Sequence, residues 1–215
     1  MSKIAILDYG MGNLRSVQKA FEHVAPDQEI IVTGDAGVVK AADRVVFPGQ
    51  GAIGGCMRLL DESGLRDALM DAMKNKPFLG ICLGLQALFE HSEEGGGVDM
   101  LGVIPGNVRH FGGLGLVMNG LKIPHMGWNQ VHRTQRHPLW RKIDQNDWFY
   151  FVHSYYVDAD NDSDIAGITR YGEDFVSAAG RDNVFAVQFH PEKSQHAGLQ
   201  LLKNFTLWDG GSQLG

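Results

Sequence analysis

Short apolar runs alternate with helical patterns along the first ninety residues. The runs are rich in Ile, Val and Phe and each is closed by Gly, Pro or Asp, which predicts buried strands at 3–10, 29–34, 44–49 and 77–82. Apolar positions at helical spacing lie between them, at 13–25 and 54–75. This alternation predicts an α/β fold whose central sheet is mainly parallel and flanked by helices.

The pattern changes near residue 98. Strand-like runs separated by Gly, Asn and Asp predict antiparallel hairpins beside the parallel sheet, at 98–111, 121–133, 148–157, 166–171, 175–180 and 184–190. Within them, the aromatic run 148–156 predicts a central strand buried on both faces. A last helical pattern at 196–208 precedes a tail, 209–215, that we expect to be flexible. Because no repeat or linker divides the chain, we expect one domain over residues 1–215.

Composition narrows the class of protein. With 44% hydrophobic and 20% charged residues, the 215-residue chain can bury a sizeable core. It has no apolar stretch of roughly 20 residues and no signal-peptide pattern, so we expect a cytoplasmic protein without a membrane partner. The net charge of −6 and the lack of a Lys/Arg run argue against nucleic acid. Two separated cysteines do not make a disulfide framework.

Cys82 stands at a predicted strand-to-helix turn, between two glycines in GICLG (80–84). This spacing matches a nucleophile elbow with Cys in place of Ser, at the carboxyl edge of the sheet where α/β folds bind ligands. Amides at the start of a following helix would stabilise a thiolate and lower the pKa of Cys82. The alternative is a buried cysteine that acts as a small hydrophobe, which is our interpretation of Cys56.

A thiolate nucleophile needs a base, and the base needs a group that orients it. His190 and Glu192 stand two residues apart at the end of a strand-like run, where an extended backbone would point both side chains the same way. Pro191 between them suits a strand end. An isolated His-Pro-Glu string is more often a surface loop, but together with the elbow it predicts a Cys-His-Glu triad.

Donors for an oxyanion are predicted in the glycine-rich segment FPGQGAIGG (47–55), through the amides of Gly49, Gln50 and Gly51. The same segment satisfies G-x-G-x-x-G, which leaves dinucleotide binding as an alternative. That alternative is weak because the segment follows the third predicted strand, and the next strand ends in the cysteine elbow instead of the acidic residue that such sites require.

Three other features are ambiguous from the residues alone. The nine histidines lack metal-ligand spacing, so we expect no metal. His153 and Ser154 inside the aromatic run could bond to each other internally or line the site. Gln86 lies one helical turn after Cys82, so it could grip a bound substrate or be a solvated helix residue.

The strings GICLGLQ, FPGQGA and QFHPEKS together resemble the class I glutamine amidotransferases, and the resemblance spans nearly the whole chain. Three further strings narrow this resemblance to the glutaminase subunits of imidazole glycerol phosphate synthases: LDYGMGNLRSV, KIPHMGWNQV and YFVHSYYV. The resemblance implies the fold predicted above, no cofactor, and hydrolysis of the glutamine side-chain amide by Cys82, His190 and Glu192.

The resemblance also implies where glutamine binds: along the oxyanion segment, at the residues beside the nucleophile, and along the strand that holds the His-Ser pair. These positions are Gly49, Gln50, Gly51, Leu83, Gln86, His153, Ser154 and Tyr155. Many family members have Val where this chain has Gln50. Since a backbone amide can donate from either residue, the difference concerns how easily the peptide reorients, and so regulation more than chemistry.

A partner is implied as well, namely a cyclase subunit that receives the ammonia within a heterodimer. The chain has no room for a second synthase domain, and ammonia released into water at neutral pH is largely protonated. Three alternatives stay open: the glutaminase subunit of a pyridoxal phosphate or anthranilate synthase, a catalytically silent binding module, and a free-standing cysteine hydrolase.

Overall fold

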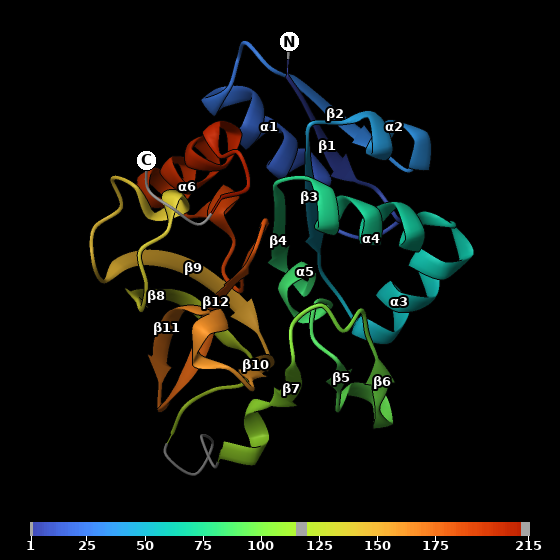
Figure 1. Ribbon diagram of the computed structural model, residues 1–215. Helices are drawn as coiled ribbons and strands as arrows, with labels where there is room; N and C mark the ends of the chain where they lie inside the picture. The colour runs from blue at the N-terminus through green and yellow to red at the C-terminus, as the bar shows by residue number, and fades with distance from the viewer. Residues whose placement is uncertain (1, 115–119, 212–215) are drawn as a thin grey trace.

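The computed structural model describes residues 2–114 and 120–211 (Figure 1). Five strands and the helices between them make up the first part: β1 (Lys3–Leu7), α1 (Leu14–Val24), β2 (Glu29–Thr33), α2 (Ala36–Ala41), β3 (Arg44–Gly49), α3 (Ile53–Glu62), α4 (Leu65–Asn75), β4 (Phe78–Cys82), α5 (Leu83–Gln86) and β5 (His91–Ser92). The second part consists mainly of strands and ends in a helix: β6 (Val98–Asp99), β7 (Gly106–His110), β8 (His125–Arg133), β9 (Asp147–His153), β10 (Tyr155–Ala159), β11 (Ile165–Tyr171), β12 (Glu173–Arg181), β13 (Val184–Val187) and α6 (Gln195–Leu207).

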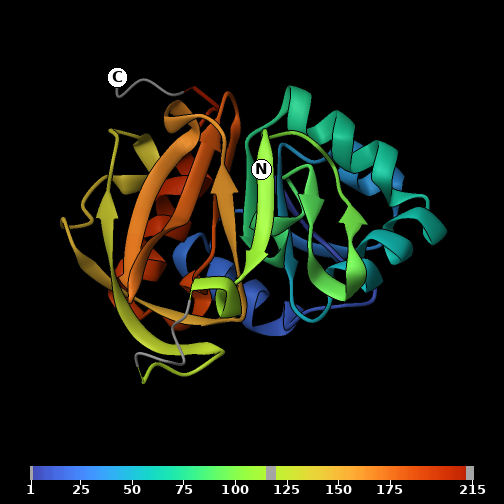
Figure 2. The same ribbon diagram turned by 90° about the horizontal axis from the view of Figure 1, so that it is seen from below.

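The strands join in one mixed sheet. Its parallel part has the order β2-β1-β3-β4-β13, and antiparallel strands β12, β10, β11, β8 and β9 continue from β13. Figure 2 shows these later strands, in yellow and orange, on the side opposite the teal helices. The prediction of a mainly parallel central sheet with flanking helices and antiparallel hairpins is confirmed.

Two hydrophobic clusters cover the two faces of the parallel sheet. One contains residues of α3 and α4, and the other contains residues of α1 and α6, which lie side by side (Figure 1). Side chains of a strand alternate between them: Val45 and Phe47 belong to the first cluster, and Val46 to the second. At the end of β4, Cys82 belongs to the α1/α6 cluster and Leu83 to the α3/α4 cluster.

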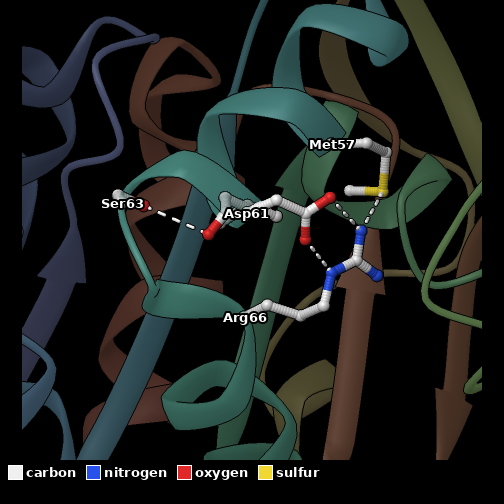
Figure 3. Close-up of polar contacts among 5 residues, drawn as sticks. Met57, Asp61, Ser63 and Arg66 are labelled. Atoms are coloured by element: carbon white, nitrogen blue, oxygen red, sulfur yellow. Dashed lines mark hydrogen bonds and ion pairs between the residues drawn. The ribbon is translucent and has the colours of Figure 1, made fainter.

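The helix predicted at 54–75 is two helices, α3 and α4. Gly64 adopts φ +68°, a left-handed conformation that glycine favours and that ends a helix. Figure 3 shows how the break is held: the Ser63 hydroxyl donates to a backbone carbonyl of α3, and Arg66 at the start of α4 pairs with Asp61. The apolar spacing continues across the break, so it could not reveal the turn.

The aromatic run is not one central strand, and that prediction is wrong. The chain breaks at Ser154 into β9, which lies outside the main strand order and pairs with β8, and β10, which pairs with β7 and β12. Burial alternates along β9, and Trp148 is 51% exposed. Aromatic residues can satisfy a half-exposed strand, which is why the composition was misleading.

Other boundaries also differ from the prediction. In 98–111 only β6 and β7 are strands, and the segment between them, which contains Gly102 and Pro105, is not a strand. The short helix α2, capped by the Asp35 carboxylate, was not predicted. The strand predicted at 184–190 ends at Val187. Of the predicted tail, residues 212–215 lie outside the described residues.

The turn from β4 to α5 depends on close backbone contacts. Cys82 has φ +55° and ψ −105°, a conformation that costs on the order of 1–3 kcal/mol for a residue with a side chain. A Cβ atom on Gly84 would overlap the carbonyl oxygen of Phe47 on β3, and one on Gly80 would overlap the Gly84 carbonyl. Both glycines of GICLG are therefore required by packing between neighbouring chain segments.

We expect Gly84→Ala to destabilise the protein by about 3 kcal/mol, because the new methyl group would push α5 away from β3. Gly113→Ala is the matched control, since a Cβ there meets no atom within 4 Å. Urea unfolding of both variants measures the difference. Equal midpoints for the two variants would contradict the packing argument.

Candidate active site

A cavity with a volume of about 830 Å³ opens at the carboxyl ends of β3 and β4. It is lined by segments that are distant in sequence, and nearly all the predicted site residues take part: Gln50, Gly51, Cys82, Leu83, Gln86, His153, Ser154, Tyr155 and His190. The sheet order explains this convergence. β4 lies between β3 and β13, so the segments that follow these three parallel strands meet at one edge.

Gly49 and Glu192 are the two predicted site residues that do not line the cavity. Gly49 pairs with Cys82 across β3 and β4, and a side chain on it would overlap the Tyr9 hydroxyl. The next two residues of the predicted oxyanion segment reach the cavity, where Gly51 has φ +95°. The segment thus passes directly beside Cys82.

His190 is held between the thiol and a carboxylate. Its Nδ1 lies 2.9 Å from Glu192 Oε1, and both side chains are almost fully buried. The carboxylate accepts the Nδ1 proton, so Nε2 is the nitrogen that is left for Cys82. The backbone fixes the imidazole as well, because the His190 amide donates to the Tyr150 carbonyl at 2.9 Å.

The two side chains meet for a different reason from the one predicted. Pro191, Glu192 and Lys193 form one turn of 3₁₀ helix, in place of an extended strand, and this turn brings Glu192 back to the imidazole. Ser194 closes the turn: its hydroxyl donates to the His190 carbonyl at 2.6 Å and accepts from the Tyr150 amide at 2.9 Å.

The electrostatics of this group favour a charged imidazole. Burial alone would lower the pKa of His190, but Cys82 and Glu192 interact with its protonated form and raise the pKa to about 10. A thiol that gives its proton to this imidazole becomes a thiolate paired with an imidazolium. The helix that follows Cys82, α5, has only four residues, so its dipole contributes little positive potential at the sulfur.

Gln86 is buried and lines the cavity, so the alternative of a solvated helix residue is excluded. Its Nε2 donates to the Tyr155 carbonyl at 3.1 Å and to Gln188 Oε1 at 3.0 Å. These bonds use both amide hydrogens, which leaves only Oε1, an acceptor, for a ligand. Gln86 is therefore suited to contact an ammonium or amide N–H of a substrate.

Gln188 was missed by the sequence analysis. It is fully buried, and its Nε2 donates to the Cys82 sulfur at 3.5 Å. The residue lies two positions before His190 within an apolar run, so a lone amide among buried positions was the available signal.

His153 and Ser154 both line the cavity, but they do not bond to each other. His153 Nδ1 contacts the Tyr155 carbonyl at 2.8 Å, and its Nε2 contacts His125 at 3.0 Å. Burial lowers the pKa of His153 to about 3. This imidazole is consequently neutral, the opposite state to His190 in the same cavity.

Two charged residues at the cavity were also not predicted as site residues. Glu94 lines it, with Oε2 accepting from the Ile53 amide at 2.9 Å, and Lys193 lines it with an exposed side chain. Glu94 lies in the short segment between β5 and β6. The local sequence did not predict that this segment reaches the cavity. The Glu94 carboxylate and Gln86 Oε1 are both acceptors in the cavity lining, which suits the cavity to a cationic group.

Cys56 is fully buried in the α3/α4 cluster, in agreement with its structural interpretation. Burial raises its pKa to about 12. Within residues 2–114 and 120–211, no three His, Cys, Asp or Glu side chains are grouped so as to hold a metal ion. Across the same described ranges, no helix has the length and apolar content needed to cross a membrane.

The family model described as "Glutamine amidotransferase class-I" matches residues 5–208. A protein of Dechloromonas aromatica is 58% identical over 208 residues, which cover 95% of this chain and 96% of that protein. A protein of Nitrosomonas europaea is 55% identical over 211 residues, covering 97% and 99%. Both are called "Imidazole glycerol phosphate synthase subunit HisH".

Solved structures show the same fold at lower identity. A structure described as a glutamine amidotransferase superposes with a TM-score of 0.69 at 15% identity, covering 94% of this chain and 98% of that one. A structure described as PurLQS from Thermotoga maritima has a TM-score of 0.67 at 14% identity, covering 96% and 98%.

We expect iodoacetamide to alkylate Cys82 and leave Cys56 unmodified in the folded protein, because only Cys82 has a neighbouring base and lies at a cavity. Glu192→Gln should slow alkylation at pH 7 by about tenfold, since it removes a negative charge that raises the pKa of His190. Mass spectrometry of timed samples gives both rates, and Cys82→Ala controls for background. Unchanged kinetics in Glu192→Gln would refute the proposed electrostatics.

Proposed function

This chain belongs to the class I glutamine amidotransferase family, and on that premise we propose that it is the glutaminase subunit of an imidazole glycerol phosphate synthase. The main support is the identity of 55% and 58% to relatives of that name over nearly the full length of both chains. The cavity adds independent support, because a cysteine, a histidine and a glutamate converge there. Such a subunit serves histidine biosynthesis.

Cys82 acts as the nucleophile. Its thiolate attacks the side-chain amide carbon of glutamine, and the electrons of the C=O bond move onto oxygen. Amides of the segment Gly49–Gly51, or that of Leu83, are the nearby candidates to stabilise this oxyanion. His190 then protonates the leaving nitrogen, and ammonia departs from a glutamyl thioester.

Water completes the cycle. His190, now neutral, removes a proton from a water molecule that attacks the thioester carbon, and glutamate leaves as Cys82 recovers its charge pair with the imidazole. Glu192 holds the imidazole through Nδ1 in both steps. The substrate's α-ammonium fits the acceptors Glu94 and Gln86 Oε1, which lie on the cavity wall.

Ammonia must reach a partner before it is lost to water, and we assign that partner as a cyclase subunit in a heterodimer. Two large exposed apolar side chains lie on β8, the strand that pairs with β9 next to the cavity. Met126 and Trp128 are 66% and 43% exposed on β8, and Met126 pairs across the strands with Val152, which lines the cavity. Large exposed apolar side chains beside a site favour a docking surface.

We expect the isolated chain to hydrolyse glutamine slowly and the cyclase subunit with its nucleotide bound to stimulate hydrolysis strongly, because the oxyanion amides must be aligned at the right time. Steady-state glutamate release, with and without the partner, measures this effect. Cys82→Ala should lower the stimulated rate at least about a thousandfold. Turnover that is equal with and without the cyclase would contradict the coupling, and activity in Cys82→Ala would refute the nucleophile.

We expect Trp128→Lys to weaken cyclase binding by about tenfold or more, since it places a charge in an apolar interface. Leu207→Lys is the matched control, because Leu207 is 69% exposed on α6 and lines none of the described cavities. Binding of each variant to the purified cyclase is measured by titration calorimetry. Equal affinities for the two variants would place the interface elsewhere.

A further inference from the structure

A row of hydrogen bonds outside the Cys-His-Glu group runs from β8 to the cavity wall. Asn129 Nδ2 lies 3.2 Å from His125 Nε2, His125 Nδ1 lies 3.0 Å from His153 Nε2, and His153 Nδ1 lies 2.8 Å from the Tyr155 carbonyl. Both imidazoles are more than nine-tenths buried. The row therefore connects β8 to the backbone carbonyl of Tyr155, a residue that lines the cavity.

The direction of every bond in this row is fixed. A carbonyl can only accept, so His153 carries its proton on Nδ1, and in a neutral ring Nε2 is then an acceptor. His125 must donate to it from Nδ1, which leaves His125 Nε2 to accept from the Asn129 amide. Donation runs from Asn129 through both histidines to the Tyr155 carbonyl, with one tautomer allowed at each ring.

The surroundings keep both rings neutral. Burial lowers the pKa of His125 to about 4 and that of His153 to about 3. Their ring neighbours are aromatic, with centroids 4.1–6.4 Å away: Phe111, Phe151, Tyr171 and Phe175. A cage of this kind excludes water and offers no carboxylate, so an imidazolium is disfavoured there.

The Tyr155 carbonyl connects this row to the nucleophile. It also accepts from Gln86 Nε2 at 3.1 Å, and the same amide donates to Gln188, whose Nε2 donates to the Cys82 sulfur at 3.5 Å. A shift of this carbonyl would therefore move the side-chain amide of Gln86. A shift of Gln86 would in turn move the Gln188 amide that faces the sulfur. Every group named here contacts the next one directly.

We propose that Asn129, His125 and His153 form a one-way hydrogen-bond relay that fixes the Tyr155 carbonyl and, through Gln86 and Gln188, orients the donor that stabilises the Cys82 thiolate. His125 is a positioning residue, because it does not line the cavity itself and acts there only through its bond to His153. The proposal rests on the proposed glutaminase activity for its kinetic readout only.

His125→Phe tests the relay, because the new ring suits the aromatic cage but has no donor for His153. We expect it to slow iodoacetamide alkylation of Cys82 about threefold to tenfold and to lower kcat/KM for glutamine in the cyclase complex by about tenfold. His137→Phe is the matched control. His137 is another buried histidine whose pKa is lowered to about 4, but it stacks on Phe185 and does not line the active-site cavity.

His125→Asn should restore part of the alkylation rate, since its Nδ2 can donate near the position of the imidazole Nδ1. Histidine nitrogen NMR of the unmodified protein should show the Nδ1–H tautomer at both His125 and His153, a result that does not depend on glutaminase activity.

Three results would overturn the relay: Nε2–H tautomers at His125 or His153, alkylation of His125→Phe within twofold of the unmodified protein, or an equal loss of alkylation in His137→Phe. A protein with the expected tautomers and alkylation rates but no glutamate release would refute the proposed function and leave the relay standing.

Discussion

The close contact between Gly84 and the carbonyl of Phe47 constrains the position of Cys82 at the end of β4. It draws the chain after β4 tightly against β3, and Cys82 takes a positive φ at the point where the backbone turns. Because β3, β4 and β13 are parallel neighbours, the same turn places the sulfur between the glycine segment on one side and His190 on the other. The site is thus a consequence of strand order and of one close backbone approach.

Three histidines near this cavity illustrate how the partner decides the charge of a buried imidazole. All are buried, and burial alone lowers each pKa. His190 has a carboxylate and a thiol as partners, and its pKa is raised. His125 and His153 have each other, a carbonyl and an amide, and theirs are lowered. The cavity wall consequently combines one imidazole suited to carrying protons with two that are suited to holding fixed tautomers.

Local strings in the sequence identified the elbow, the oxyanion segment and the His-Glu pair, because each is built from residues close together in the chain. The contacts of Gln86 and Gln188 join positions 69 and 102 residues apart, and no local pattern predicts such pairs. The break at Gly64 was hidden by apolar spacing that continues across it, and the break at Ser154 by aromatic residues that suit buried and half-exposed strands equally. The His190–Glu192 pair was predicted from an incorrect geometry, because the local sequence did not distinguish an extended strand from the 3₁₀ turn at Pro191–Lys193.

Cys82 and Leu83, adjacent in the chain, belong to different hydrophobic clusters on opposite faces of the sheet. Cys82 therefore lies at the boundary between the two clusters, and a single peptide unit links its packing to that of Leu83. A substitution that changes the packing of either cluster can therefore change the position of the sulfur. The interior residues on both faces of the sheet thus have two tasks, since they stabilise the fold and also fix the place of one sulfur atom.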